Sequence, residues 1–127
     1  MFTICVKSHY DSAHFIRNYN GKCERLHGHR YVVEAGLAFE QLGEGGMAYD
    51  FSDAKRALRA VTDEMDHQNI NDLPAFQEVE TSAENQAKYI FGELKARADA
   101  FPEKLLFVKV WETPNQWALY SERTLFI

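Results

Sequence analysis

The sequence predicts an α+β fold in which two helices cover one face of a four-stranded antiparallel sheet, in the order β-β-α-α-β-β. Two segments near the start alternate apolar and polar residues, two central segments repeat apolar residues at helical spacing, and two apolar segments end the chain. Short turns between consecutive strands favour antiparallel hairpins. With 46% apolar residues and few Gly or Pro, residues 1–127 are expected to form one domain.

The first two strands place three histidines at related positions. Apolar residues at every second position predict a strand over residues 2–13, and His14, which follows it, has the same parity. A polar loop then leads to a second strand, expected at about residues 27–39. Because residues two apart in a strand point to the same face, His27 and His29 are expected to be neighbours on one surface.

Two amphipathic helices are expected in the middle of the chain. Ser52 or Asp53 can cap the first of them. The apolar stripe of this helix consists of Ala54, Leu58, Val61 and Met65. Thr81 and Glu84 have the spacing of a capping box at the start of the second helix. The apolar face of the second helix consists of Ala83, Ala87, Ile90, Leu94 and Ala98.

The last part of the chain is expected to add two strands, at residues 104–112 and 116–127, joined by a turn at Thr-Pro-Asn. Two helices placed on one side can cover only one face of the resulting four-stranded sheet. The opposite face still carries apolar side chains, so the protein is expected to associate with copies of itself.

Charge and cysteine content argue against several classes of protein. The net charge of −5 argues against binding to nucleic acid, which normally requires a basic face. No apolar run approaches the roughly 20 residues of a membrane span, and the start of the chain does not have the pattern of a signal peptide. Only two cysteines occur, and they form no CxxC pair. We therefore expect a cytoplasmic protein without nucleic-acid or membrane partners.

His14, His27 and His29 are the candidate metal ligands. Three imidazoles without a fourth protein ligand are typical of a catalytic zinc site, which keeps one position open for water or substrate. A structural zinc site has four protein ligands, and Cys23 is the candidate for the fourth. A lone histidine is more often a surface or hydrogen-bonded core residue, but three in this arrangement favour a catalytic site that holds Zn²⁺.

Cys23, Asp66 and His67 are the candidate acid–base residues. Cys23 lies between Lys22 and Arg25, and nearby cations favour a thiolate, although an ordinary free cysteine is the alternative. Asp66 could orient His67 and raise its basicity, as in general acid–base catalysis. However, the side chains of adjacent residues rarely point the same way, and a polar helix terminus is an equally good interpretation of this pair.

Glu112, Ser82 and Glu84 are the candidate substrate-binding residues. Glu112 ends an apolar strand, where a carboxylate at the rim of a pocket can accept two parallel N–H bonds from the edge of a guanine or pterin ring. The alternative is an exposed strand end before a turn. Ser82 and Glu84 can also serve simply as the start of the second helix, and spacing alone does not separate these alternatives.

Six motifs occur in one order over about residues 8–120, namely DSAHF, GKCERLHGHRY, GMAYDFSD, MDHQNIND, TSAEN and VWETP. In order and spacing they resemble the family of 6-pyruvoyl-tetrahydropterin synthase and 6-carboxytetrahydropterin synthase. The resemblance implies the tunnelling fold (T-fold), in which trimers close their sheets into a barrel and two trimers stack into a homohexamer. Such an assembly would explain the uncovered face of the sheet.

The same resemblance implies a role for each candidate residue. The zinc ligands would be His14, His27 and His29. Cys23 would be the catalytic base, and Asp66 and His67 would complete a triad, delivered from a neighbouring subunit, so that active sites lie at subunit interfaces. Glu112 would anchor the pterin ring, and Ser82 matches a hydroxyl position of the pterin pocket that is usually threonine.

The implied substrate is a pterin triphosphate, 7,8-dihydroneopterin triphosphate, and two products are open. The bacterial 6-carboxytetrahydropterin synthase of queuosine synthesis, which also releases acetaldehyde, has three residues between its cysteine and the His-Gly-His triplet, whereas the animal-type pyruvoyl enzyme has five. Here Glu-Arg-Leu separates Cys23 from His27, which favours the carboxy enzyme. A variant directed to folate has glutamate in place of the cysteine. Arg17, Lys22 and Arg25 are candidates for holding phosphate, or are solvated surface charges.

Overall fold

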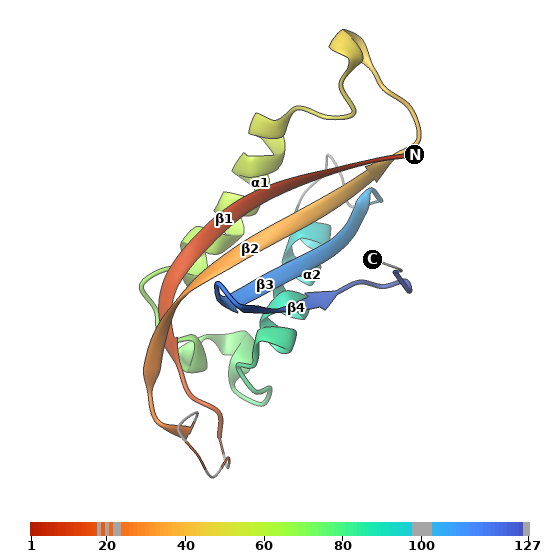
Figure 1. Ribbon diagram of the computed structural model, residues 1–127. Helices are drawn as coiled ribbons and strands as arrows, with labels where there is room; N and C mark the ends of the chain where they lie inside the picture. Colours follow the sequence, from red (N-terminus) through yellow and green to blue (C-terminus); the bar gives the residue numbers. More distant parts are fainter. Residues whose placement is uncertain (18, 20, 22–23, 98–102, 126–127) are drawn as a thin grey trace.

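A four-stranded antiparallel sheet carries two helices on one of its faces (Figure 1). The computed structural model describes residues 1–17, 19, 21, 24–97 and 103–125. The strands, which are neighbours in chain order, are β1 (Phe2–His14), β2 (His27–Phe39), β3 (Leu105–Thr113) and β4 (Gln116–Tyr120). The helices are α1 (Phe51–Met65) and α2 (Ala83–Arg97). The predicted α+β class and the order β-β-α-α-β-β are confirmed.

The hairpin of β1 and β2 is longer than the rest of the sheet (Figure 1). Its register runs without interruption from the pair Phe2–Phe39 to the pair His14–His27. Among the described residues, the ladder between β2 and β3 reaches only as far as Val32, which pairs with Trp111. The loop end of the hairpin, where His14 pairs with His27, therefore extends beyond the part of β2 that pairs with β3.

The core lies between the sheet and the two helices. Alternate residues of β1 and β2, such as Val6, Tyr10 and Val33, are buried on the face toward the helices. The predicted stripe of α1 is confirmed, since Ala54, Leu58, Val61 and Met65 are all buried. The predicted face of α2 is confirmed for Ala83, Ala87, Ile90 and Leu94, while Ala98 lies outside the described residues. Gln86 and Phe91, which the sequence reasoning left out, are also buried in α2.

The predicted caps of both helices are wrong by one to three residues. At α1 the cap is Asp50, whose Oδ1 accepts the N–H of Ser52 at 2.8 Å, because Ser52 and Asp53 already lie inside the helix. At α2 the hydroxyl of Ser82 accepts the N–H of Asn85 at 3.2 Å. The hydroxyl of Thr81, which was expected to cap this helix, is buried and donates to a carbonyl of the loop after β1 instead.

Short 3₁₀ helices lie in the connections before and after α1, and the last strand is shorter than predicted. The segment after α1 forms two short 3₁₀ helices, Ile70–Asp72 and Pro74–Phe76, and a third, Glu44–Gly46, precedes α1. Strand β4 ends at Tyr120 rather than at residue 127, since the hydroxyl of Ser121 donates to the carbonyl of Leu106 at 2.6 Å and the described chain then leaves the sheet.

The face of the sheet away from the helices combines charged and aromatic side chains. Lys7, Glu34 and Lys109 face one another across three strands, since Glu34 pairs with both lysines in the register. Trp111 and Trp117 are paired next to them, with ring centroids 6.1 Å apart. The expected self-association through this face stays a prediction. In the described part of the chain, neither helix has the length and apolar character needed to span a membrane.

Candidate metal centre

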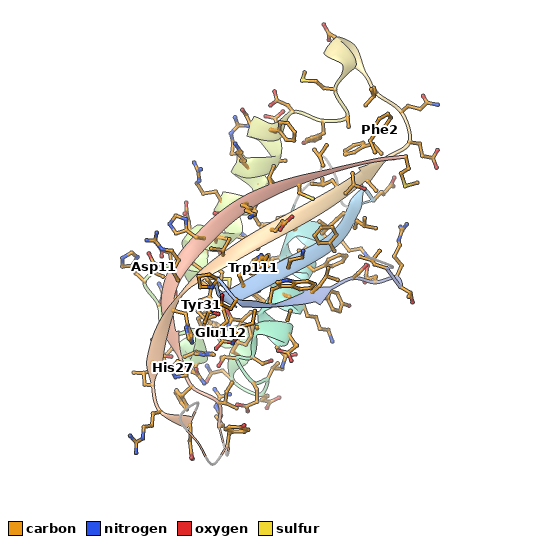
Figure 2. The ribbon with its side chains drawn as sticks, in the orientation of Figure 1. Phe2, Asp11, His27, Tyr31, Trp111 and Glu112 are labelled. Carbon is orange, nitrogen blue, oxygen red and sulfur yellow. The ribbon has the colours of Figure 1, made fainter. Side chains whose placement is uncertain are left out.

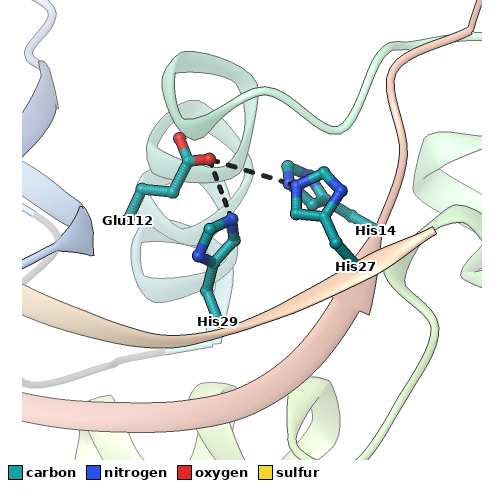
Figure 3. A group of neighbouring side chains, drawn as sticks. All are labelled: His14, His27, His29 and Glu112. Atoms are coloured by element: carbon teal, nitrogen blue, oxygen red, sulfur yellow. Dashed lines mark hydrogen bonds and ion pairs between the residues drawn. The ribbon is translucent and has the colours of Figure 1, made fainter. Parts of the chain in front are cut away.

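Four side chains from three strands converge at the loop end of the β1–β2 hairpin (Figure 3). The register of β1 and β2 places His14 opposite His27, and His29 lies two residues further along β2 on the same face. Glu112 joins them from the end of β3. Among the described residues these four form the group able to hold a metal ion, with one ligand atom each and all four atoms within 4.8 Å of one another. Figure 2 shows His27, Tyr31 and Glu112 at one end of the sheet and Phe2 at the other.

The distances within this metal group suit a tetrahedral ion. The Nε2 atoms of His14 and His27 are 3.0 Å apart, and Nε2 of His29 lies 3.0 Å from Oε1 of Glu112. Nε2 of His14 lies 3.8 Å from the same carboxylate oxygen. Ligand atoms bound at zinc distances in a tetrahedron lie about 3.3 Å from one another. The spacing therefore fits Zn²⁺ without a large rearrangement.

The protons of two imidazoles are fixed on the side away from the group. Nδ1 of His14 lies 2.8 Å from the carbonyl oxygen of Thr81, and Nδ1 of His27 lies 2.6 Å from that of Arg25. A carbonyl only accepts hydrogen bonds, so Nδ1 carries the proton in both rings and Nε2 bears a lone pair. Two lone pairs that face each other repel unless a proton or a cation lies between them, so this donor set favours a bound cation.

His29 completes the donor set. Its Nε2 is buried and has no hydrogen bond of good geometry, although the carboxylate of Glu112 is near. Burial lowers the pKa of His14 and that of His29, and it outweighs the opposite effect of Glu112 on both rings. Both imidazoles are therefore neutral at pH 7, the form that binds a metal.

Asp66 and His67 are brought together, although adjacent side chains rarely meet. Nδ1 of His67 lies 2.9 Å from Oδ2 of Asp66. His67 also has a positive φ of 55°, an uncommon backbone conformation for a residue other than glycine. Both residues are attached to β1, since Oδ1 of Asp66 accepts the N–H of Asp11 at 2.8 Å and the N–H of His67 donates to the carbonyl of Asp11 at 2.8 Å.

The pair of Asp66 and His67 lies at the outer edge of β1 and is not part of the metal group. The hydrogen bond from the N–H of Asp11, followed by the contact with His67, lowers the pKa of Asp66, so this residue remains a carboxylate. The side chain of His67 is 81% exposed. It lines a shallow depression together with Gly28 and His29. Within one chain, this imidazole therefore faces outward.

The candidate base and one candidate phosphate ligand, Cys23 and Lys22, lie outside the described residues. Arg25 is exposed and supplies the backbone carbonyl that holds His27. Arg17 has a structural role, because its guanidinium donates to the carbonyl of Phe76 at 2.9 Å and to other groups of the loop before α2. That engagement speaks against a main role for Arg17 in holding phosphate.

The candidate substrate residues are not gathered in one place by direct contacts. Ser82 caps α2, and Glu84 is exposed in the first turn of that helix. Glu112, expected at the rim of a pocket, lines a cavity of about 610 Å³ together with His29 and Trp111. Its place within the metal group was not predicted, because the position of a strand end relative to another strand depends on register.

Comparison with known proteins gives the same family in sequence and in structure. A family profile described as 6-pyruvoyl tetrahydropterin synthase matches residues 3–123. The 6-carboxy-5,6,7,8-tetrahydropterin synthase of Haemophilus influenzae is 30% identical over an alignment of 144 positions, gaps included, that covers 96% of this chain and 100% of that protein. The 6-pyruvoyl tetrahydrobiopterin synthase of Dictyostelium discoideum is 33% identical over 102 residues, which cover 79% of this chain and 73% of that protein.

The fold has a counterpart among solved structures. The structure of 6-pyruvoyl tetrahydropterin synthase from Caenorhabditis elegans superposes with a TM-score of 0.87 at 29% sequence identity, over 96% of each chain. This similarity confirms the predicted T-fold. Relatives named for the carboxy product and for the pyruvoyl product are similar to this chain at nearly the same level of identity.

Proposed function

This chain belongs to the 6-pyruvoyl tetrahydropterin synthase family, and from that premise we propose that it is a zinc-dependent 6-carboxytetrahydropterin synthase of queuosine precursor synthesis. The substrate would be 7,8-dihydroneopterin triphosphate. One observation carries the choice of product: three residues, Glu-Arg-Leu, separate Cys23 from His27. The full-length match to a carboxy synthase supports the same choice.

The alternative product, 6-pyruvoyl-tetrahydropterin, differs by a single chemical step. Loss of triphosphate from the substrate turns the outer part of its three-carbon side chain into a methyl ketone. The hydroxyl-bearing carbon next to the ring becomes a second carbonyl, as its two hydrogens pass to the C=N bond of the dihydropterin ring, which becomes a tetrahydropterin without an external oxidant. Addition of one water and cleavage of the bond between the two carbonyl carbons then leaves a carboxylate on the ring and releases acetaldehyde. The similarity to a pyruvoyl synthase supports this alternative. Release of acetaldehyde distinguishes the two reactions, because only the carboxy synthase produces it.

The metal group would hold the reacting side chain of the substrate. His14, His27 and His29 would present three Nε2 atoms to the ion. Bound zinc would supply Lewis-acid polarisation of the substrate hydroxyls, which acidifies the neighbouring C–H bonds. The carboxylate of Glu112, 3.0 Å from Nε2 of His29, would bind the pterin ring rather than the ion, so the fourth position on the metal would stay open for the substrate. This carboxylate can accept the N–H groups of the pterin ring edge and so orient the side chain toward the metal.

Proton transfer would be performed by residues outside the metal group. The thiolate of Cys23 would remove the acidified proton. His67, oriented by its contact with the carboxylate of Asp66, would return a proton to the substrate as the triphosphate leaves. Because the imidazole of His67 points outward from its own chain, it would act in a neighbouring subunit of a homohexamer.

A product assay tests the proposal. The zinc-loaded protein is incubated with 7,8-dihydroneopterin triphosphate, and acetaldehyde is measured by coupled reduction alongside the released triphosphate. We expect both in equal amounts from the wild-type protein and neither from Cys23→Ala, which should retain zinc. Triphosphate without acetaldehyde would identify the pyruvoyl reaction. Loss of zinc from Cys23→Ala would indicate instead a structural zinc module with Cys23 as the fourth ligand.

A further inference from the structure

Gln86 is a fully buried amide on the apolar face of α2, directly behind the metal group. Its Oε1 lies 2.5 Å from the hydroxyl of Tyr10, and its Nε2 lies 2.8 Å from the carbonyl oxygen of Thr81. The same carbonyl of Thr81 lies 2.8 Å from Nδ1 of His14. Burying a polar side chain on an apolar helix face costs free energy unless it is hydrogen-bonded. The hydrogen bonds of Gln86 therefore indicate what this amide contributes to the structure.

The direction of every hydrogen bond in this chain of contacts is determined. The carbonyl of Thr81 can only accept, so it receives one N–H from Gln86 and one from His14. With its amide nitrogen at Thr81, Gln86 presents its oxygen to Tyr10, whose hydroxyl must therefore donate. Gln86 thus helps to hold the acceptor that keeps the proton of His14 on Nδ1.

We propose that Gln86 is a positioning residue for the bound metal, which acts through the carbonyl of Thr81 to keep Nε2 of His14 free as a metal donor. The inference rests on the proposed function of the metal group. Histidine ligands are generally oriented by a partner at their second nitrogen, and loss of such a partner typically lowers metal affinity about 10- to 100-fold. Here the nearer partner is the peptide carbonyl of Thr81, at 2.8 Å from Nδ1 of His14, against 3.2 Å for the hydroxyl of the same residue. The side chain of Gln86 holds this carbonyl in place.

The carbonyl of Thr81 needs such a support, because it lies just before α2 and is not held by the helix itself. The N–H of Gln86 bonds to the carbonyl of Ser82, and the N–H of Asn85 bonds to the hydroxyl of Ser82. Both hydrogen bonds that the carbonyl of Thr81 accepts in the described structure come from side chains, those of Gln86 and His14.

Two further contacts hold the arrangement from the other side. The hydroxyl of Thr81 donates to the carbonyl of Phe15, at 3.0 Å. The ring of Tyr10 stacks on Tyr31 with centroids 5.0 Å apart, and Tyr31 in turn meets the edge of His14 at 5.6 Å. Packing thus fixes the plane of the His14 ring, while Gln86 fixes the position of the hydrogen-bond acceptor.

The test replaces Gln86 by methionine in the full-length protein. Gln86→Met keeps the length of the side chain and removes the bonds to both Tyr10 and Thr81. We expect zinc affinity, measured by competition with a chelator, to fall about 10- to 100-fold. The visible spectrum of the protein loaded with Co²⁺ should also change, because the geometry of one ligand is altered. This spectrum does not depend on turnover.

The matched control is Thr62→Val. It removes another hydrogen bond between a helix and β1, the partly buried contact of 2.7 Å between the hydroxyls of Thr62 and Ser8, six residues along the strand from His14. We expect Thr62→Val to bind zinc as the wild-type protein does, even where its resistance to urea falls. A loss of zinc affinity in this control equal to that in Gln86→Met would attribute the effect to general destabilisation and overturn the inference.

A second variant keeps the inference testable if Gln86→Met does not fold. Tyr10→Phe retains the ring and removes only the hydroxyl that donates to Gln86. We expect a fall in zinc affinity of a few fold and a smaller change in the Co²⁺ spectrum. If the folded variants match the wild-type protein in both measurements, the inference is wrong while the metal site stands. If the wild-type protein itself binds no zinc, the proposed function fails as well.

Discussion

The metal group and the pair of Asp66 and His67 combine the same two kinds of side chain, but the fold holds them in opposite ways. His14 is 1% exposed, and its second nitrogen is fixed by a backbone carbonyl. His67 is held by its backbone to the edge of β1, and its side chain is 81% exposed. The metal group is assembled within one chain and is partly buried, whereas the pair is oriented by the chain and presented outward.

The difference matches two tasks that the proposed zinc lyase would perform. A metal site requires several donors at fixed distances, which a hairpin register can supply from one chain. Proton transfer requires an imidazole that can reach the substrate, and the contact with Asp66 orients the exposed ring of His67. Variants of the two regions should therefore affect different measurements.

The largest effect is expected from His27→Ala, which removes a central donor of the metal group. Four-ligand zinc sites bind with about 10–16 kcal/mol, so one ligand contributes roughly 3 kcal/mol and its loss lowers zinc affinity about 10²- to 10³-fold. Turnover should disappear with the metal. Chelator competition measures the affinity, and His9→Ala, an exposed histidine of β1, serves as the control. Zinc binding that survives His27→Ala would remove His27 from the site.

The second effect is expected from His67→Ala, which should leave zinc binding intact. Loss of a positioned general acid–base residue lowers the rate about 10²- to 10⁴-fold. The measurement pairs turnover with zinc content on the same sample, and His9→Ala again serves as the control. If His67→Ala loses zinc in proportion to activity, the separation of the two regions is incorrect.

The same separation can be tested in mixed assemblies. When His67→Ala and Cys23→Ala are unfolded together and reassembled, some sites should combine an intact His67 from one chain with an intact Cys23 from another. We expect part of the activity to return if the pair acts in a neighbouring subunit. No recovery in a mixture that assembles normally would place both residues of each site in one chain.

The smallest effect is expected from pH on the metal-free protein. Burial keeps the folded-state pKa of His14 and His29 below the usual value of about 6.5, so the unfolded chain binds protons that the folded chain does not. Stability should therefore fall as pH drops through about 6.5 toward the folded-state values. Carboxylates with lowered pKa, such as Asp66, contribute only below about pH 4.

Urea unfolding at pH 7.5 and 5.5 measures this effect. Histidine side chains change protonation between these two pH values, whereas carboxylates with a lowered pKa do not. Saturating zinc should raise the midpoint at pH 7.5, because the metal binds only the folded chain. The increase should be smaller at pH 5.5, where protons compete for the same nitrogens. A midpoint of the metal-free protein that rises as pH falls would contradict the assignment of buried, neutral imidazoles.

Much of the fold followed from local patterns. The alternation in residues 2–13 and 27–39 predicted two strands within one residue of their observed ends, and the helical stripes predicted the buried faces of α1 and α2. The predicted caps were wrong, because several polar residues compete for the same role. Which of them caps a helix depends on contacts with distant segments, as for Thr81. The predicted end of β4 was also wrong.

The sequence by itself determined which face each strand residue takes, and with it the grouping of His14, His27 and His29, because strand periodicity and hairpin register are local properties. Only the tertiary structure decided that Glu112 joins them, since that depends on the register of a strand far along the chain. It also decided the contact of Asp66 with His67 and the carbonyl that holds His14. The positive φ of His67 and the backbone carbonyl that accepts from His14 cannot be predicted from the types of side chain in the sequence.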